Sequence, residues 1–230
     1  MLIQRLVDGY PEGCSIRNES GNLPVHCVVA NGTATQSLMI LHIQFPQGLV
    51  AVNNEGNTPL HCHLCGSHYE SNTSMVEMLL NLNASSARMI NNSGEIPLHV
   101  AAREWGCGVE SLRMLVDAFP RSLQSQCDKG NFPLHCVLSS LHYDDAAKEQ
   151  VDFLLNADRD SARRSNWKGE LPIHAFTEYF PRRPSPALIE VLDMVVENFP
   201  EALDTFDDRG YLPLHAACDA ENISFSLELI

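Results

Sequence analysis

The sequence lacks the features that mark membrane-spanning, secreted or nucleic-acid-binding chains. No stretch approaches the ~18 uninterrupted apolar residues of a membrane span, and the first residues do not form the hydrophobic segment of a secretory signal. Basic residues are scarce, with 15 Lys and Arg against 29 Asp and Glu and a net charge of −14. Such a surface repels phosphate backbones, which argues against nucleic acid and favours a basic protein segment as the partner. These absences predict a cytoplasmic or nuclear protein without membrane contact.

Recognisable catalytic motifs are also missing. The sequence contains no Gly-x-Ser-x-Gly, no glycine-rich phosphate loop and no His-Glu-x-x-His. The paired acids Asp144–Asp145 and Asp207–Asp208 fall in predicted loops or turns, where charge usually serves solvation. We therefore expect no enzymatic activity, no catalytic residue and no cofactor.

The sequence does contain one phrase six times: glycine, two variable residues, proline, an aliphatic residue and histidine. The copies begin at Gly21, Gly56, Gly94, Gly130, Gly169 and Gly210 and end at His26, His61, His99, His135, His174 and His215. Successive histidines lie 35, 38, 36, 39 and 41 residues apart, a period typical of stacked-repeat proteins. Because catalytic groups normally occur once, the sixfold recurrence predicts a structural role, in which a neutral imidazole bridges backbone groups of neighbouring repeats.

Each repeat is predicted to form two helices and a turn. Proline suits the first turn of a helix, so each repeat proline should open a first helix. Apolar residues at i, i+3, i+4 and i+7 predict a second helix, as at Leu112, Leu115, Val116 and Phe119, and Pro120 then ends it. An Asn or Asp three residues before five of the glycines should cap an extended turn in which glycine takes a positive φ.

Pro-Leu-His at the start of a helix, with glycine three residues before the proline, resembles the ankyrin repeat, whose hallmark is Thr-Pro-Leu-His-x-Ala. The threonine is present only as Thr58, and Leu, Ile or Phe replaces it elsewhere. The resemblance covers essentially the whole chain. It implies an all-α fold, an ankyrin-type α-solenoid of stacked helix-loop-helix repeats joined by extended turns.

The resemblance also implies the domain organisation. We expect one array over residues 1–230, with a partial repeat at 1–10, repeats beginning near 11, 46, 84, 120 and 159, and a truncated repeat at 200–230. Because both end repeats are incomplete, we expect the chain to be a fragment of a longer array.

Ankyrin repeats imply a non-catalytic protein–protein interaction scaffold that grips its partner with a concave face and turn tips. The residues that flank each repeat glycine vary on this constant frame and are the candidate partner-binding positions. They are Asn54, Glu55, Asn57, Asn92, Ser93, Glu95, Asp128, Lys129, Asn131, Trp167, Lys168, Glu170, Asp208, Arg209 and Tyr211. Trp167 and Tyr211 stand out because an exposed aromatic side chain can anchor an interface. Alternatively, the array is the regulatory or targeting arm of a larger enzyme.

A zinc-binding regulator is a third interpretation. Five potential ligands fall within eight residues: His61, Cys62, His63, Cys65 and His68. Against zinc, His61 and Cys62 are repeat positions, His63 projects away from Cys62 on a helix, and no second Cys-x-x-Cys exists. We predict no metal site. The cysteines, including Cys27 and Cys136 directly after repeat histidines, are expected to be buried free thiols.

Overall fold

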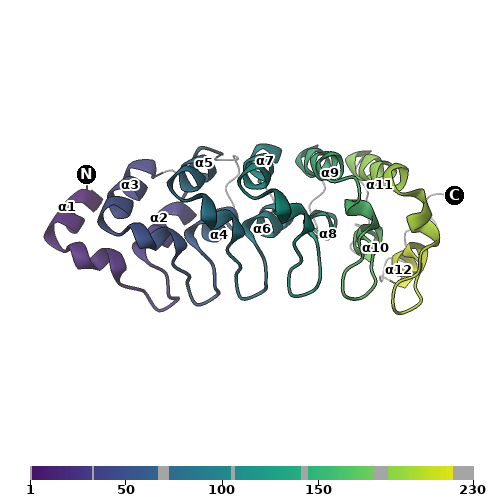
Figure 1. The fold of residues 1–230 in the computed structure, drawn as a ribbon, viewed down its shortest axis with the longest axis horizontal. Helices are drawn as coiled ribbons and strands as arrows, with labels where there is room; N and C mark the ends of the chain where they lie inside the picture. The colour runs from purple at the N-terminus through teal and green to yellow at the C-terminus, as the bar shows by residue number, and fades with distance from the viewer. Residues whose placement is uncertain are drawn as a thin grey trace. The chain divides into compact units, whose positions relative to one another are not determined.

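The computed structural model describes residues 2–32, 34–66, 73–104, 107–140, 145–178 and 186–219 (Figure 1). All regular secondary structure in these ranges is helical, so the predicted all-α fold is confirmed there. The chain divides into two compact units, the N-terminal unit Met1–Ser122 and the C-terminal unit Leu123–Ile230.

The N-terminal unit alternates short first helices with longer second helices. The first helices are α2 (Pro24–Ala30), α4 (Pro59–Leu64) and α6 (Pro97–Arg103). The second helices are α1 (Leu2–Gly9), α3 (Thr35–Gln44), α5 (Thr73–Leu82) and α7 (Val109–Ala118). Neighbouring first helices pack on one another, and each repeat buries its apolar side chains between the two layers.

The C-terminal unit follows the same plan. Its first helices are α8 (Pro133–Leu138), α10 (Pro172–Glu178) and α12 (Pro213–Asp219), and its second helices are α9 (Asp145–Ala157) and α11 (Pro186–Asn198). The α8, α10 and α12 helices pack in sequence, as do α9 and α11. Phe176 and Ile173 from α10 lie in the core with Leu154 from α9 and Val191 from α11.

Proline opens every first helix, as predicted. The residue before it has an extended backbone, for example Leu23 (φ −75°, ψ 161°) before Pro24. This geometry suits proline, which disfavours a helical conformation in the preceding residue and lacks the N–H that the first turn leaves unpaired. The first helices are therefore fixed at their N-termini by sequence alone.

The segment after each second helix is more ordered than the predicted extended turn. It begins with a 3₁₀ helix: η1 (Pro11–Ser15), η2 (Pro46–Val50), η3 (Ala84–Arg88), η4 (Pro120–Gln124), η5 (Ser161–Arg163) or η6 (Pro200–Asp204). The third residue of each five-residue segment is small because it faces the repeat interior. A methyl group added at Gly48 would lie 3.3 Å from Cγ1 of Val25 and 3.2 Å from Cδ1 of Phe45.

Candidate partner-binding hairpins

Six five-residue loops, here called repeat hairpins, precede the first helices. They are residues 18–22, 53–57, 91–95, 127–131, 166–170 and 207–211. In the Asn53 hairpin, the backbone N–H of Asn53 donates to the carbonyl of Asn57 at 3.0 Å, and Gly56 has a φ of +77°. Oδ1 of Asn53 accepts from the N–H groups of Glu55 and Asn57 at 3.0 and 2.9 Å. The predicted capped turn with a positive glycine φ is thus confirmed.

Four other hairpins are closed by the same pair of side-chain contacts, made by Asn18, Asn91, Asn166 and Asp207. The remaining hairpin begins with Cys127 and keeps the backbone bonds, with Cys127 N–H 3.1 Å from the carbonyl of Asn131. Nε2 of Gln126 there donates to the carbonyl of Gly130 at 3.0 Å. The hairpin shape therefore persists where the capping side chain changes.

The repeat histidines link successive hairpins. Nδ1 of His61 accepts from the backbone N–H of Thr58 at 3.3 Å, and Nε2 lies 3.0 Å from the carbonyl oxygen of Glu95 in the next hairpin. In the C-terminal unit, Nε2 of His135 lies 2.9 Å from the carbonyl oxygen of Glu170. A backbone N–H can only donate and a carbonyl can only accept, so the imidazole is the neutral Nε2–H tautomer.

Burial keeps the imidazoles of His26 and His61 neutral. Burial lowers the pKa of His26 and of His61 below the ordinary value, because charging a ring inside the stack loses its hydration. His26 also lies with Nε2 3.0 Å from the carbonyl of Ala51 and 3.2 Å from that of Asn57. Nδ1 of His26 accepts from the Leu23 N–H at 3.1 Å, so both ring nitrogens have partners.

Side-chain amides form a second link between hairpins. Nδ2 of Asn53 donates to Oδ1 of Asn22 in the preceding hairpin at 2.9 Å. The same contact joins Asn91 to Asn57 at 3.1 Å and, in the C-terminal unit, Asn166 to Asn131 at 2.9 Å. Backbone groups add a third link, as from Asn54 N–H to the carbonyl of Ser20 at 3.1 Å.

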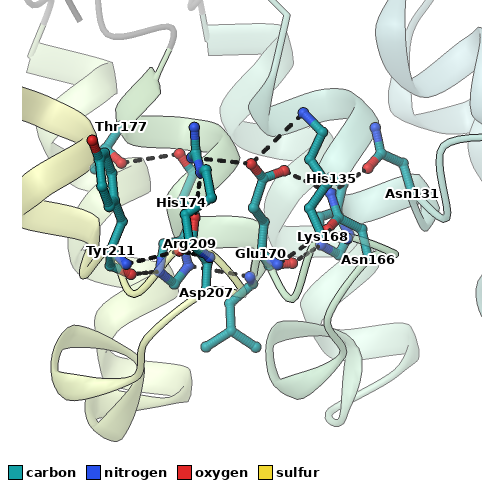
Figure 2. Close-up of polar contacts among 11 residues, drawn as sticks. Asn131, His135, Asn166, Lys168, Glu170, His174, Thr177, Asp207, Arg209 and Tyr211 are labelled. Atoms are coloured by element: carbon teal, nitrogen blue, oxygen red, sulfur yellow. Dashed lines mark hydrogen bonds and ion pairs between the residues drawn. The ribbon is translucent and has the colours of Figure 1, made fainter. Parts of the chain in front are cut away.

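The last described hairpin replaces this amide with a carboxylate, and an arginine supplies the missing donor (Figure 2). Nε of Arg209 donates to Oδ2 of Asp207 at 2.9 Å, while Nη2 donates to Oε1 of Glu170 in the preceding hairpin at 3.3 Å. Glu170 also accepts from Nδ2 of Asn166 at 2.8 Å and lies 3.8 Å from Nζ of Lys168. Two cations therefore converge on one carboxylate.

The Asp207 carboxylate is held in its charged form. Burial acts to raise its pKa, but hydrogen bonds from the N–H of Tyr211 and from Arg209 outweigh that effect and lower the pKa below its ordinary value. This network was not predicted from the sequence. Its signal is the aspartate at a position where the other capped hairpins carry asparagine.

Burial divides the candidate partner-binding residues into two groups. Asn57, Glu95 and Glu170 are buried, whereas the sequence pattern predicted them to be open to a partner. Each follows its repeat glycine directly and turns back between hairpins, where the Asn91 and Asn166 amides bind it. Asn131 and Tyr211 are half-buried. The other candidates are exposed: Asn54, Glu55, Asn92, Ser93, Asp128, Lys129, Trp167, Lys168, Asp208 and Arg209.

The two candidate aromatic residues differ in environment. Trp167 is 64% exposed, and its indole covers Gly130 of the preceding hairpin, where an added methyl group would lie 2.4 Å from Cγ. Tyr211 packs within its own hairpin, with the guanidinium carbon of Arg209 4.8 Å from its ring centroid. Trp167 therefore presents a largely free aromatic surface, whereas the ring of Tyr211 is partly covered.

The candidate zinc cluster is engaged in other contacts. Nδ1 of His63 lies 3.0 Å from the carbonyl oxygen of Val29, and Sγ of Cys62 accepts from Nδ2 of Asn53 at 3.7 Å. Burial raises the pKa of Cys62 to about 12, which keeps this thiol protonated, whereas Cys65 is exposed. His68 lies outside the described residues.

The potential metal ligands and the cysteines are scattered over the described ranges. No three His, Cys, Asp or Glu side chains in the described ranges are grouped to hold a metal ion. All eight cysteines are free, and the expectation of burial holds for only four of them: Cys14, Cys107, Cys127 and Cys136. Cys62 is half-buried, and Cys27, Cys65 and Cys218 are exposed. The position after the repeat histidine is thus covered in some repeats and open in others.

Taken with the fold, the hairpins define a helical repeat protein. The family model described as Ankyrin repeat matches residues 55–91, which run from the Asn53 hairpin through α4, α5 and η3 to the start of the next hairpin. The predicted resemblance to ankyrin repeats is confirmed, and such repeats form protein–protein interaction domains. A comparison with curated proteins found no match. Among the described helices, none has the length and apolar character needed to cross a membrane.

Proposed function

We propose that this chain is a non-catalytic scaffold that binds another protein through the tips of its repeat hairpins. One observation carries the proposal: the two residues before each repeat glycine are exposed in every hairpin, and they differ from repeat to repeat. They are Glu19–Ser20, Asn54–Glu55, Asn92–Ser93, Asp128–Lys129, Trp167–Lys168 and Asp208–Arg209. A constant frame with variable exposed side chains is suited to selective binding.

The chemistry of the frame supports a binding role over catalysis. A general base needs a free nitrogen or carboxylate within reach of a substrate proton. Instead, the His61 imidazole uses both ring nitrogens on backbone groups, and the Asp207 carboxylate accepts from Arg209 and Tyr211. These groups are used in holding the repeats together.

Site-specific photocrosslinking tests the proposal. Benzoylphenylalanine replaces Glu55 or Trp167 at a hairpin tip, or the exposed Glu77 on α5 or Glu197 on α11 as matched controls on second helices. After irradiation in an extract of the source cells, the hairpin positions should crosslink to one common protein identified by mass spectrometry. Crosslinks to that protein only from α5 or α11, or none above background from any position, would contradict the proposal.

A further inference from the structure

The three hairpins of the C-terminal unit each carry a cation directly before the repeat glycine. These residues, called here the basic row, are Lys129, Lys168 and Arg209, and all three are exposed. The equivalent residues of the N-terminal unit are Ser20, Glu55 and Ser93. The C-terminal hairpins therefore differ in charge from the N-terminal hairpins, although their backbones are closed in the same way.

The basic row lies within an otherwise acidic unit. Residues 123–230 contain 9 Lys and Arg against 19 Asp and Glu. Exposed acids of this unit lie on the second helices, including Asp152 on α9 and Asp193 on α11, and Figure 1 shows the hairpins at the opposite end of the repeats from these helices. The second-helix ends therefore carry acids, whereas the hairpins combine the three cations with the exposed Asp128 and Asp208.

Two cations of the basic row, Lys168 and Arg209, form ion pairs with buried carboxylates, and the third, Lys129, does not within the described part of the chain. Lys168 and Arg209 share Glu170, at 3.8 and 3.3 Å, and Arg209 also pairs with Asp207 at 2.9 Å. The Lys168 side chain remains 63% exposed and that of Arg209 46% exposed. Lys129 has no ion pair to any residue in the described ranges.

The position before each cation of the basic row holds an acid in two hairpins and a tryptophan in the third. The residues that precede the three cations are Asp128, Trp167 and Asp208, all exposed. The Trp167 indole lies over Gly130, the chain neighbour of Lys129, and Trp167 itself directly precedes Lys168. A partner that combines carboxylates with an apolar side chain matches two lysines around an aromatic ring.

From this arrangement we infer that the C-terminal hairpins bind an acidic segment of the partner protein, with carboxylates on Lys129 and Lys168 and an apolar side chain against Trp167. The inference rests on the proposed function and reverses the expectation of a basic partner, which came from the net charge of the whole chain. The charge of the whole chain does not set the charge at the tips, where Lys129, Lys168 and Arg209 stand beside the exposed Asp128 and Asp208, because exposed charges beyond a Debye length of about 8 Å are largely screened at physiological salt.

Fluorescence anisotropy with two labelled eight-residue peptides tests the inference. The acidic peptide contains six glutamates and two leucines, and the basic peptide replaces each glutamate with lysine. We expect the full chain to bind the acidic peptide at least about tenfold more tightly than the basic one, and binding should weaken as salt rises. Equal binding, a preference for the basic peptide, or tighter binding of a single-stranded octanucleotide would overturn the inference.

Variants locate the site. Lys129→Glu with Lys168→Glu should weaken acidic-peptide binding about tenfold or more, whereas the single reversal Arg159→Glu, at an exposed residue between α9 and η5, should leave it unchanged. Asp128→Asn should tighten binding of the acidic peptide, because it removes a carboxylate beside Lys129 that repels the glutamates of the peptide. Weaker binding of Asp128→Asn, or no effect of the double reversal in a protein with an unchanged circular dichroism spectrum, would overturn the inference.

The two experiments fail separately. If hairpin positions crosslink to a protein but the acidic peptide does not bind, the proposed scaffold function stands and the acidic partner is excluded. If neither hairpin crosslinking nor peptide binding occurs, both are excluded.

Discussion

The two units link their hairpins with the same backbone scheme but with different side chains. In the N-terminal unit, amides join Asn53 to Asn22 and Asn91 to Asn57. The C-terminal unit begins in the same way, with Asn166 joined to Asn131, but its next hairpin starts with Asp207, which has no N–H to donate. Arg209 supplies that donor to Glu170. Between these hairpins the side-chain link is thus kept although the residue that donates changes.

The histidine links are common to both units, so breaking them should produce the largest effect. His61→Ala removes the acceptor of the buried Thr58 N–H and one of the two donors to the buried Glu95 carbonyl, which keeps its bond from the Asn91 N–H. Leaving one buried N–H unpaired and losing the link to the next hairpin should cost about 2 kcal/mol of unfolding free energy, measured by urea denaturation. His174→Ala in the C-terminal unit should cost a similar amount, because its ring contacts Leu171 and Tyr211 in the same way.

His215 provides the matched control. It is exposed and keeps the contact from the Leu212 N–H at 3.0 Å, with no contact from Nε2 to another hairpin in the described ranges. His215→Ala should therefore cost about 1 kcal/mol or less. If His61→Ala and His215→Ala destabilise equally, the bridge between repeats is not what the histidines contribute.

The ionic link of the C-terminal unit should have a smaller effect that depends on Asp207. Arg209→Ser leaves the buried Asp207 and Glu170 carboxylates without this donor, which should cost about 1 kcal/mol because the guanidinium is partly exposed. In an Asp207→Asn background, an amide can donate to Glu170 as Asn91 does to Asn57 in the N-terminal unit. The cost of Arg209→Ser should then fall below about 0.5 kcal/mol.

A double-mutant cycle measures this dependence by urea denaturation. Arg159→Ser serves as the control partner for Asp207→Asn, since Arg159 is exposed outside the hairpins and the two changes should be additive. Additive effects of Arg209→Ser and Asp207→Asn would show that Arg209 does not replace the amide link of the other hairpins.

Sequence patterns predicted the frame of these repeats because its determinants are local. Proline at a helix start and glycine with a positive φ each depend on one residue's backbone, as at Pro59 and Gly56. The 3₁₀ helices were missed because a segment of three to five residues is too short to show a period. The burial of Glu95 and Glu170 was also missed, since it arises from contacts with other hairpins and other elements.

The same distinction applies to the candidate site. Variation around the repeat glycine indicated ten exposed positions, but it could not separate them from the buried residue that follows the glycine. The side-chain direction in a tight turn depends on the neighbouring hairpin, which lies more than 30 residues away in sequence. The basic row became visible only when Lys129, Lys168 and Arg209 were placed at one equivalent hairpin position in a single unit.

An effect no larger than that of Arg209→Ser concerns one serine position in the 3₁₀ helices of the two units. In the N-terminal unit, Oγ of the buried Ser86 donates to the carbonyl of Asn83 at 2.7 Å. At the equivalent place in the C-terminal unit, Oγ of the buried Ser161 has no partner among the described residues, and the next repeat carries the buried Ala202 there. Ser86→Ala should thus destabilise the protein by about 1 kcal/mol, whereas Ser161→Ala should be neutral or stabilise it by up to about 1 kcal/mol, because it removes an unpaired buried hydroxyl. Urea denaturation of both variants decides the point, and a loss of stability in Ser161→Ala equal to that in Ser86→Ala would show that the Ser161 hydroxyl is satisfied in solution.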